Sequence, residues 1–108
     1  MTDQEVNNVI AEYMGCTIDI EDGVEYISND ICQLGNLYTE SLDALVPVWE
    51  RLFLIDETFN IEMDYDDEHG FYWKCYFDKQ VNYINQTSPQ QAAAHATAKA
   101  IIEINKTN

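Results

Sequence analysis

The sequence predicts an α+β fold in which three helices pack on one four-stranded antiparallel sheet, in the order α-β-β-α-β-β-α. Two stretches alternate apolar and polar residues around a turn, which is typical of β-hairpins. Three other stretches repeat apolar residues at helical spacing. With 108 residues, of which 46% are hydrophobic, the chain has the size and composition of one globular domain. We therefore expect residues 1–108 to form a single acidic domain.

The first helix is predicted over residues 3–14. Thr2 and Glu5 have the spacing of a capping box, in which each side chain satisfies a backbone N–H at the start of the helix. Apolar residues then recur at helical spacing, and Gly15 is a natural stop at the C-terminal end.

The first hairpin follows directly. Ile18 and Ile20 alternate with polar residues, and Asp22-Gly23 is a favoured pair for a tight turn, so residues 24–28 form the returning strand. Residues 29–40 are interpreted as a long loop. Its apolar anchors are Ile31, Leu34, Leu37 and Tyr38.

The second helix is predicted over residues 41–54, with Ser41 or Thr39 as its cap. Pro47 lies inside it and predicts a kink or a loosely formed first turn, because proline lacks an amide hydrogen and crowds the preceding turn. One apolar stripe follows the helix: Leu42, Leu45, Val46, Trp49, Leu52 and Phe53.

The second hairpin pairs residues 59–65 with residues 71–77, which alternate in the same way, around the loop "DDEHG". In this register Glu62 and Lys74 face each other and can pair. Together with the first hairpin, these strands complete the predicted four-stranded sheet.

The third helix begins at Ser88, a cap residue that is followed by proline at the first helical position. Its many alanines have little bulk and let it lie close to another surface. A short polar tail covers residues 105–108. The predicted core of the whole domain contains Val9, Leu45, Trp49, Leu52, Ile61, Trp73, Phe77 and Ile101.

Charge is the most informative feature for function. Twenty acidic residues and five basic ones give a net charge of -15. Residues 1–50 contain eleven acids and no Lys or Arg, hence -11, whereas residues 51–108 contain nine acids and five bases, hence -4. Such a surface repels nucleic acid and anionic membranes and attracts basic proteins. Solubility alone is the competing interpretation.

No pattern in the chain indicates catalysis or a cofactor. The three cysteines have no metal-type spacing, and no nucleophile, zinc-protease or phosphate-loop motif is present. Counted from Asp64 as an EF-hand loop, Gly70 stands at position 7 instead of 6, and Cys75 stands where glutamate is needed. We therefore predict no enzymatic activity, no cofactor and no metal site. No apolar run has the length of a membrane helix, and the N-terminus lacks signal-peptide features, so we expect a cytoplasmic protein.

Two stretches resemble a known family. Residues 38–52 ("YTESLDALVPVWERL") and 88–101 ("SPQQAAAHATAKAI") are similar to small proteins encoded by tailed phages and prophages, described as α-β-α sandwich domains and mostly of unknown function. No catalytic motif comes with the resemblance. It implies a phage origin, and phage genomes are rich in small proteins that disable host machinery.

These observations favour a non-enzymatic inhibitor that mimics nucleic acid and binds a basic host protein, such as a restriction or CRISPR factor. Two alternatives stay open: a sponge for a small signalling nucleotide, and a structural or assembly protein that uses its sheet to form oligomers such as a homodimer. The predicted partner-binding residues are Asp19, Glu21, Asp22, Glu25, Asp64, Asp66, Asp67 and Glu68.

Overall fold

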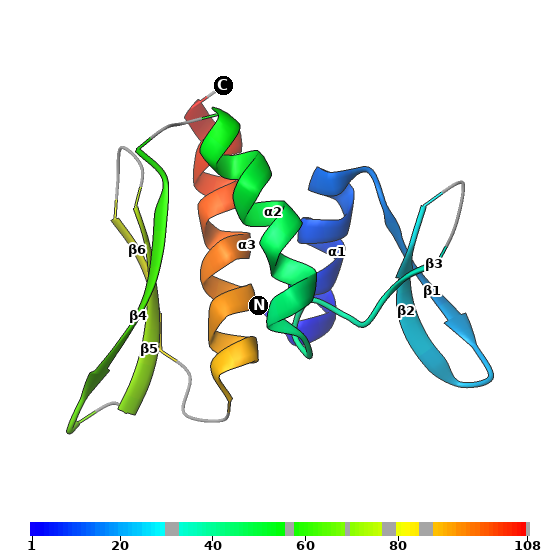
Figure 1. Ribbon diagram of the computed structural model, residues 1–108, viewed down its shortest axis with the longest axis horizontal. Helices are drawn as coiled ribbons and strands as arrows, with labels where there is room; N and C mark the ends of the chain where they lie inside the picture. Colours follow the sequence, from blue (N-terminus) through cyan, green and yellow to red (C-terminus); the bar gives the residue numbers. More distant parts are fainter. Residues whose placement is uncertain (30–32, 56–57, 69, 77–79, 85–87, 108) are drawn as a thin grey trace.

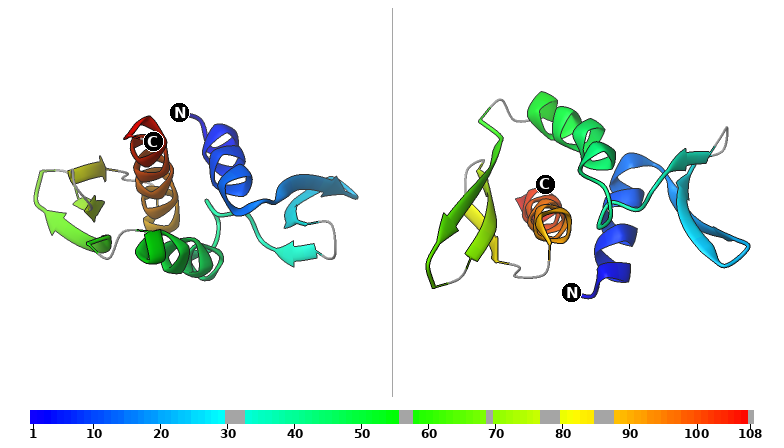
Figure 2. Two further views of the ribbon diagram at one scale, coloured as in Figure 1. Left: turned by 90° about the horizontal axis from the view of Figure 1, so that it is seen from above. Right: turned by 60° about the horizontal axis from the view of Figure 1, so that its bottom comes forward.

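The computed structural model describes residues 1–29, 33–55, 58–68, 70–76, 80–84 and 88–107. Three helices, α1 (Asp3–Met14), α2 (Leu42–Ile55) and α3 (Pro89–Thr107), form the middle of the molecule (Figure 1). A sheet lies at either end of the long axis, so the helices separate the two sheets (Figures 1 and 2).

The prediction of one four-stranded sheet is therefore wrong. The strands form two antiparallel three-stranded sheets, with the orders β1-β2-β3 and β4-β5-β6. The predicted order of helices and hairpins is otherwise retained, with one strand added after each hairpin. The strands are β1 (Thr17–Glu21), β2 (Val24–Ser28), β3 (Gln33–Gly35), β4 (Asn60–Asp66), β5 (Gly70–Tyr76) and β6 (Gln80–Ile84).

The two hairpins do not join because each finds its next strand in the chain that directly follows it. Strand β3, within the expected loop 29–40, pairs with β2, and β6 pairs with β5. Neighbouring elements in sequence are usually neighbours in space, because closing a short connection costs little entropy. The helices then pack between the completed sheets.

The local signals for α1 are confirmed. The backbone N–H of Glu5 donates to Thr2 Oγ1 at 3.2 Å, and the backbone N–H of Thr2 donates to Glu5 Oε1 at 3.2 Å, which completes the capping box. Gly15 ends the helix in the left-handed conformation, with φ of 73°.

The other two helices also begin at the predicted caps. Ser41 Oγ accepts from the backbone N–H of Ala44 at 3.3 Å, and Ser88 Oγ accepts from that of Gln91 at 3.2 Å. Helix α2 passes through Pro47. Helix α3 runs to Thr107, so the tail expected from residue 105 is helical as far as 107. That tail contains no Gly or Pro to stop the helix, and Lys106 in the last turn favours its C-terminal end.

Helix α3 is the centre of the core. It contacts β5 and β6 on one side and α1 and α2 on the other. Because it is surrounded, its small side chains are fully buried: Ala92, Ala93, Ala94, Ala96, Ala98 and Ala100 are each 0% exposed. Their size lets the neighbouring elements approach the helix closely.

Most of the predicted core is found. The buried members are Leu45, Leu52, Trp73 and Ile101. Val9, Trp49 and Ile61 are partly buried and pack against the same cluster. Phe77 lies outside the described residues. None of the helices within the described ranges is long and apolar enough to cross a membrane.

Candidate partner-binding surface

The β1–β2 hairpin stands at one end of the molecule with one face against α1 (Figure 1). Ile18 lies opposite Ile27 in the pairing register, and Ile27 is 3% exposed, so this face is the packed one. Glu25, opposite Ile20, lies on the same side of the hairpin but nearer the turn, where both side chains are exposed. Asp19 therefore points to the outer face, because side chains alternate along a strand.

The turn holds its acids in a fixed geometry. Asp22 and Gly23 both have positive φ, 53° and 80°, as a tight primed turn requires. The Asp19 carboxylate accepts hydrogen bonds from the hydroxyls of Ser28 and Thr17. These contacts orient Asp19 on the outer face of the hairpin.

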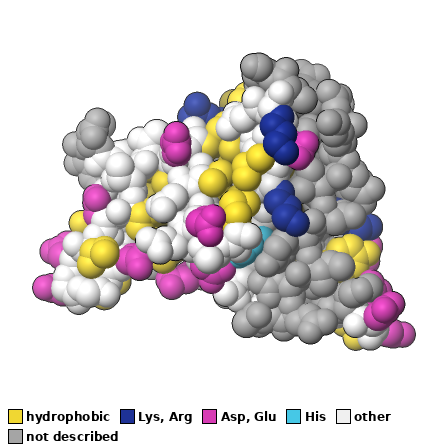
Figure 3. Space-filling model, turned by 180° about the vertical axis from the view of Figure 1, so that it is seen from behind, with side chains coloured by type: hydrophobic (Ala, Val, Ile, Leu, Met, Phe, Trp, Pro, Cys, Tyr) yellow, Lys and Arg dark blue, Asp and Glu magenta, His cyan; other side chains and the backbone are white. Residues whose placement is uncertain are grey.

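We name Asp19, Glu21, Asp22 and Glu25 the acidic hairpin. All four side chains are exposed. Since residues 1–50 contain no Lys or Arg, no base within the hairpin or α1 offsets this charge. In Figure 3 the hairpin end shows acidic side chains, whereas the basic side chains lie toward the other parts of the molecule.

The second predicted set of acids lies at the tip of the β4–β5 hairpin, beyond the opposite side of the helices (Figure 1). Lys74 faces Glu62 across the strands as predicted, but its Nζ forms an ion pair with Asp64 Oδ2 at 3.1 Å. The backbone N–H of Tyr65 also donates to Asp64 at 2.8 Å. These donors, first the Tyr65 amide and then Lys74, lower the pKa of Asp64.

The two acidic sets do not form one continuous surface. They lie at opposite ends of a molecule that is 40 Å long, and the helices separate their sheets. The tip acids would extend the acidic hairpin only if both hairpins lay on one side, and that arrangement is not found. A binding role for Asp64, Asp66, Asp67 and Glu68 remains a separate prediction.

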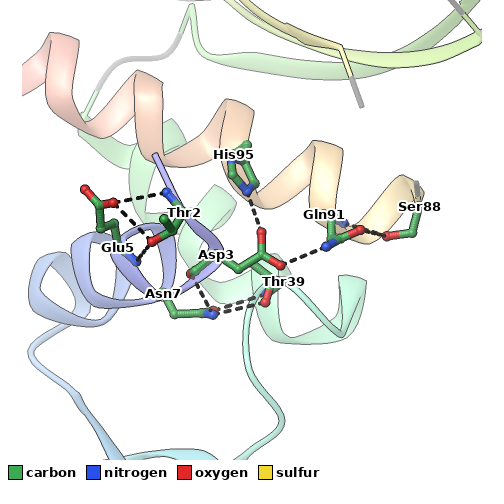
Figure 4. A network of polar contacts seen from close by, with 8 residues as sticks. All are labelled: Thr2, Asp3, Glu5, Asn7, Thr39, Ser88, Gln91 and His95. Atoms are coloured by element: carbon green, nitrogen blue, oxygen red, sulfur yellow. Dashed lines mark hydrogen bonds and ion pairs between the residues drawn. The ribbon is translucent and has the colours of Figure 1, made fainter. Parts of the chain in front are cut away.

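A polar network that the sequence did not reveal joins the starts of α1 and α3 (Figure 4). Asp3 Oδ1 lies 2.8 Å from His95 Nε2, and Asp3 Oδ2 accepts from Gln91 Nε2 at 2.8 Å. Asn7 extends the network, because its amide nitrogen donates to Thr39 Oγ1 at 3.0 Å and its oxygen accepts from the Thr39 amide at 3.2 Å. His95 is 4% exposed, whereas the Asp3 side chain is 47% exposed, so the network joins the surface of α1 to a buried side chain of α3.

A cavity of about 420 Å³ bears on the nucleotide-sponge alternative. It lies between the end of α1, strand β2 and the start of α2. Among its described lining residues are Tyr38 and Asp43, and none is Lys or Arg. Burial raises the pKa of Tyr38 to about 12, so its hydroxyl stays protonated. A phosphate needs cationic or amide donors, and among the described lining residues only the Asn36 side chain is an amide, while Asp43 adds a negative charge. This lining is therefore a poor match for a nucleotide.

The described residues bring no three His, Cys, Asp or Glu side chains together as ligands for a metal ion. His69 in the acidic loop lies outside those residues, and so does Cys32. The prediction that residues 64–70 bind no ion specifically is therefore left for experiment.

Comparisons with family models, with curated proteins and with solved structures gave no match for this chain. The resemblance to small phage proteins thus stays a prediction. Function must be inferred from the surface of the chain itself.

Proposed function

We propose that this chain is a non-enzymatic binding protein that captures a basic, nucleic-acid-binding protein through its acidic hairpin. The supporting observation is the separation of charge: the N-terminal half has a net charge of -11 without one base, and its hairpin presents four exposed carboxylates. Such a surface accelerates association with a basic partner and competes with the phosphates of nucleic acid.

The resemblance to phage proteins suggests the class of target. A phage gains when a host defence nuclease or its guide complex is blocked, and such proteins carry basic grooves for nucleic acid. We propose that the acidic hairpin occupies such a groove in the host cytosol. Inhibition then follows from exclusion of nucleic acid and needs no reaction.

The environment of the polar side chains supports a role without catalysis. Ser41 and Ser88 cap helices, and the hydroxyl of Thr97 donates to the carbonyl oxygen of Ala93 at 2.7 Å. His95 is buried against Asp3. These described groups serve the fold, whereas a nucleophile needs a base within hydrogen-bonding distance in an open cleft.

The test uses two variants with equal net charge. The hairpin variant carries Asp19→Asn, Glu21→Gln, Asp22→Asn and Glu25→Gln. The tip variant carries Asp64→Asn, Asp66→Asn, Asp67→Asn and Glu68→Gln. Both change the net charge from -15 to -11, so a difference between them reports position instead of total charge.

Partners are captured from bacterial lysate at low salt. They are then eluted with a salt gradient or, in a separate experiment, with duplex DNA. We expect the wild-type protein and the tip variant to retain a basic partner that DNA releases, and the hairpin variant to lose it at low salt. If both variants retain the partner equally, the acidic hairpin contributes only to solubility. Equal loss would assign binding to net charge alone.

A further inference from the structure

Helix α2 carries more apolar surface than the core uses. Its buried face consists of Leu45, Val48 and Leu52, each 0% exposed. A second apolar stripe follows the same helix about a quarter turn away, as 3.6 residues per turn place it. Its outermost members are exposed: Leu42 is 37% exposed, Val46 43% and Phe53 50%.

This second stripe forms one wall of a groove between α2 and β4, with a volume of about 520 Å³. Phe59 and Ile61 form the opposite wall. In Figures 1 and 2 these two elements flank α3. The lining residues that the structure describes are Val46, Trp49, Glu50, Phe53, Leu54, Phe59, Asn60 and Ile61.

The groove is attached firmly to the core. Trp49 Nε1 donates to Thr97 Oγ1 of α3 at 2.9 Å, and Thr97 is fully buried. The Trp49 ring also lies 6.1 Å from that of Trp73. A groove with a fixed aromatic side chain binds with little loss of side-chain entropy, which favours affinity.

The charge around the groove indicates which class of ligand it binds. Glu50 is the one charged side chain among the described lining residues, and the chain as a whole has a charge of -15. An acidic segment or a nucleic acid would be repelled. A second copy of this chain also has a net charge of -15, and the repulsion between two such chains opposes a homodimer through this groove. The complementary ligand is apolar on one side and basic on the other.

We propose that the groove binds an amphipathic helical segment of a basic protein. Apolar residues at i, i+3 or i+4 and i+7 would enter between α2 and β4, and Lys or Arg beside them would face Glu50. From Val46 to Leu54 the wall that α2 contributes spans about 12 Å, slightly more than two helical turns, which matches the rise from i to i+7. The inference rests on the proposed function only in taking the partner to be basic.

The probe is a fluorescently labelled synthetic peptide of about 14 residues, made of Leu and Lys with the leucines on one helical face. A Leu/Glu peptide with the same pattern and a permuted Leu/Lys peptide serve as comparisons. Binding is followed by fluorescence anisotropy at physiological salt. We expect the patterned Leu/Lys peptide to bind at least about tenfold more tightly than either comparison peptide. Equal affinity for the Leu/Glu peptide would overturn the charge argument.

The groove variant is Val46→Ser with Phe53→Ser, and its matched control is Ile20→Ser with Val24→Ser. All four side chains are exposed, Ile20 by 69% and Val24 by 64%, so both variants should fold. We expect the groove variant to bind the patterned peptide about tenfold more weakly, mainly through faster dissociation, and the control to change less than about twofold.

Two outcomes reject the groove while leaving the acidic hairpin untouched. The first is unchanged peptide affinity in the groove variant. The second is a wild-type dimer in sedimentation that Phe53→Ser converts to a monomer, because a second copy would then occupy the groove. Conversely, loss of captured partner in the hairpin variant with intact peptide binding would show the two surfaces acting independently, which supports both proposals.

Discussion

The Nε2 atom of His95 lies 2.8 Å from Oδ1 of Asp3, across 92 residues of sequence, and this contact ties α3 to the first turn of α1. The Asp3 side chain is 47% exposed, whereas that of His95 is 5% exposed. The His95 hydrogen bond is the main cause that lowers the pKa of Asp3. The contact therefore makes the docking of the two helices sensitive to acid.

The first prediction concerns Asp3→Asn. The substitution removes a charge that binds His95 and favours the N-terminus of α1, so we expect the free energy of unfolding at neutral pH to fall by about 1 kcal/mol. Because the folded-state pKa of Asp3 is lowered from 3.8, its contribution is present above that value and is lost as pH falls through the lower folded pKa. Urea unfolding at a series of pH values measures both effects.

The difference in the free energy of unfolding between the wild type and Asp3→Asn should therefore become smaller below about pH 4. Gln91→Leu removes the second hydrogen bond that lowers the pKa of Asp3 but keeps the carboxylate, so it should give a smaller loss with the same dependence on pH. A difference in stability that stays constant from neutral to strongly acidic pH would show that the carboxylate is not linked to folding.

The second prediction concerns Thr97→Val, which keeps the shape of a fully buried side chain but removes its hydroxyl. The indole N–H of Trp49 would then lack its acceptor, so we expect a loss of about 1–3 kcal/mol in the free energy of unfolding. Thr97→Ser retains the hydroxyl and should preserve the Trp49 fluorescence environment. An indole emission spectrum that is the same in both variants would contradict a role for this hydrogen bond.

The third prediction concerns Trp73, which is 9% exposed and packs in the core against Trp49. Trp73→Ala should lower the free energy of unfolding by about 3–5 kcal/mol, as large-to-small core changes do. Its buried Nε1 has no hydrogen-bond partner among the described residues. Trp73→Phe should therefore cost much less, because no hydrogen bond is given up. A loss under about 1 kcal/mol for the alanine variant would place Trp73 at the surface.

The fourth prediction concerns ion binding by the tip of the β4–β5 hairpin. The oxygens of Asp64 already accept from the Tyr65 amide, Lys74 Nζ and the Tyr72 hydroxyl, so a cation must compete with protein donors. Calorimetry with calcium, magnesium and zinc should show no binding tighter than about millimolar. A micromolar site that disappears in Asp66→Asn would establish a metal site here.

Local structure could be predicted because its signals lie within a few residues of one another. The Thr2–Glu5 capping box, the Asp22-Gly23 turn and the Ser88 cap each depend on backbone groups at most one helical turn away. The division of the strands into two sheets could not be predicted in this way. It depends on β3, which is three residues long, and on where the helices pack.

The acidic hairpin could be predicted from the sequence and the groove could not, for the same reason. The exposed acids of the first hairpin follow from composition and a turn. The groove does not, because the apolar stripe of α2 combines buried Leu45 and Leu52 with exposed Leu42, Val46 and Phe53. The packing of α2 against α3 decides which of these two faces is buried. The contact between Asp3 and His95 likewise has no local signal, since it exists only once α1 and α3 are packed.

The last prediction follows from the alanines of α3, whose small size was recognised in the sequence and whose burial is complete in the structure. Ala98 is 0% exposed on α3, which lies between the sheet of β5 and β6 on one side and α1 and α2 on the other. Ala98→Leu adds three heavy atoms where no space exists, so we expect a loss of about 1–3 kcal/mol in the free energy of unfolding from overpacking. Asn105→Leu, at an exposed position of the same helix, is the control and should change stability by less than about 0.5 kcal/mol. If Ala98→Leu instead raised the midpoint of urea unfolding, the helix would pack less tightly against its neighbours than the buried alanines indicate.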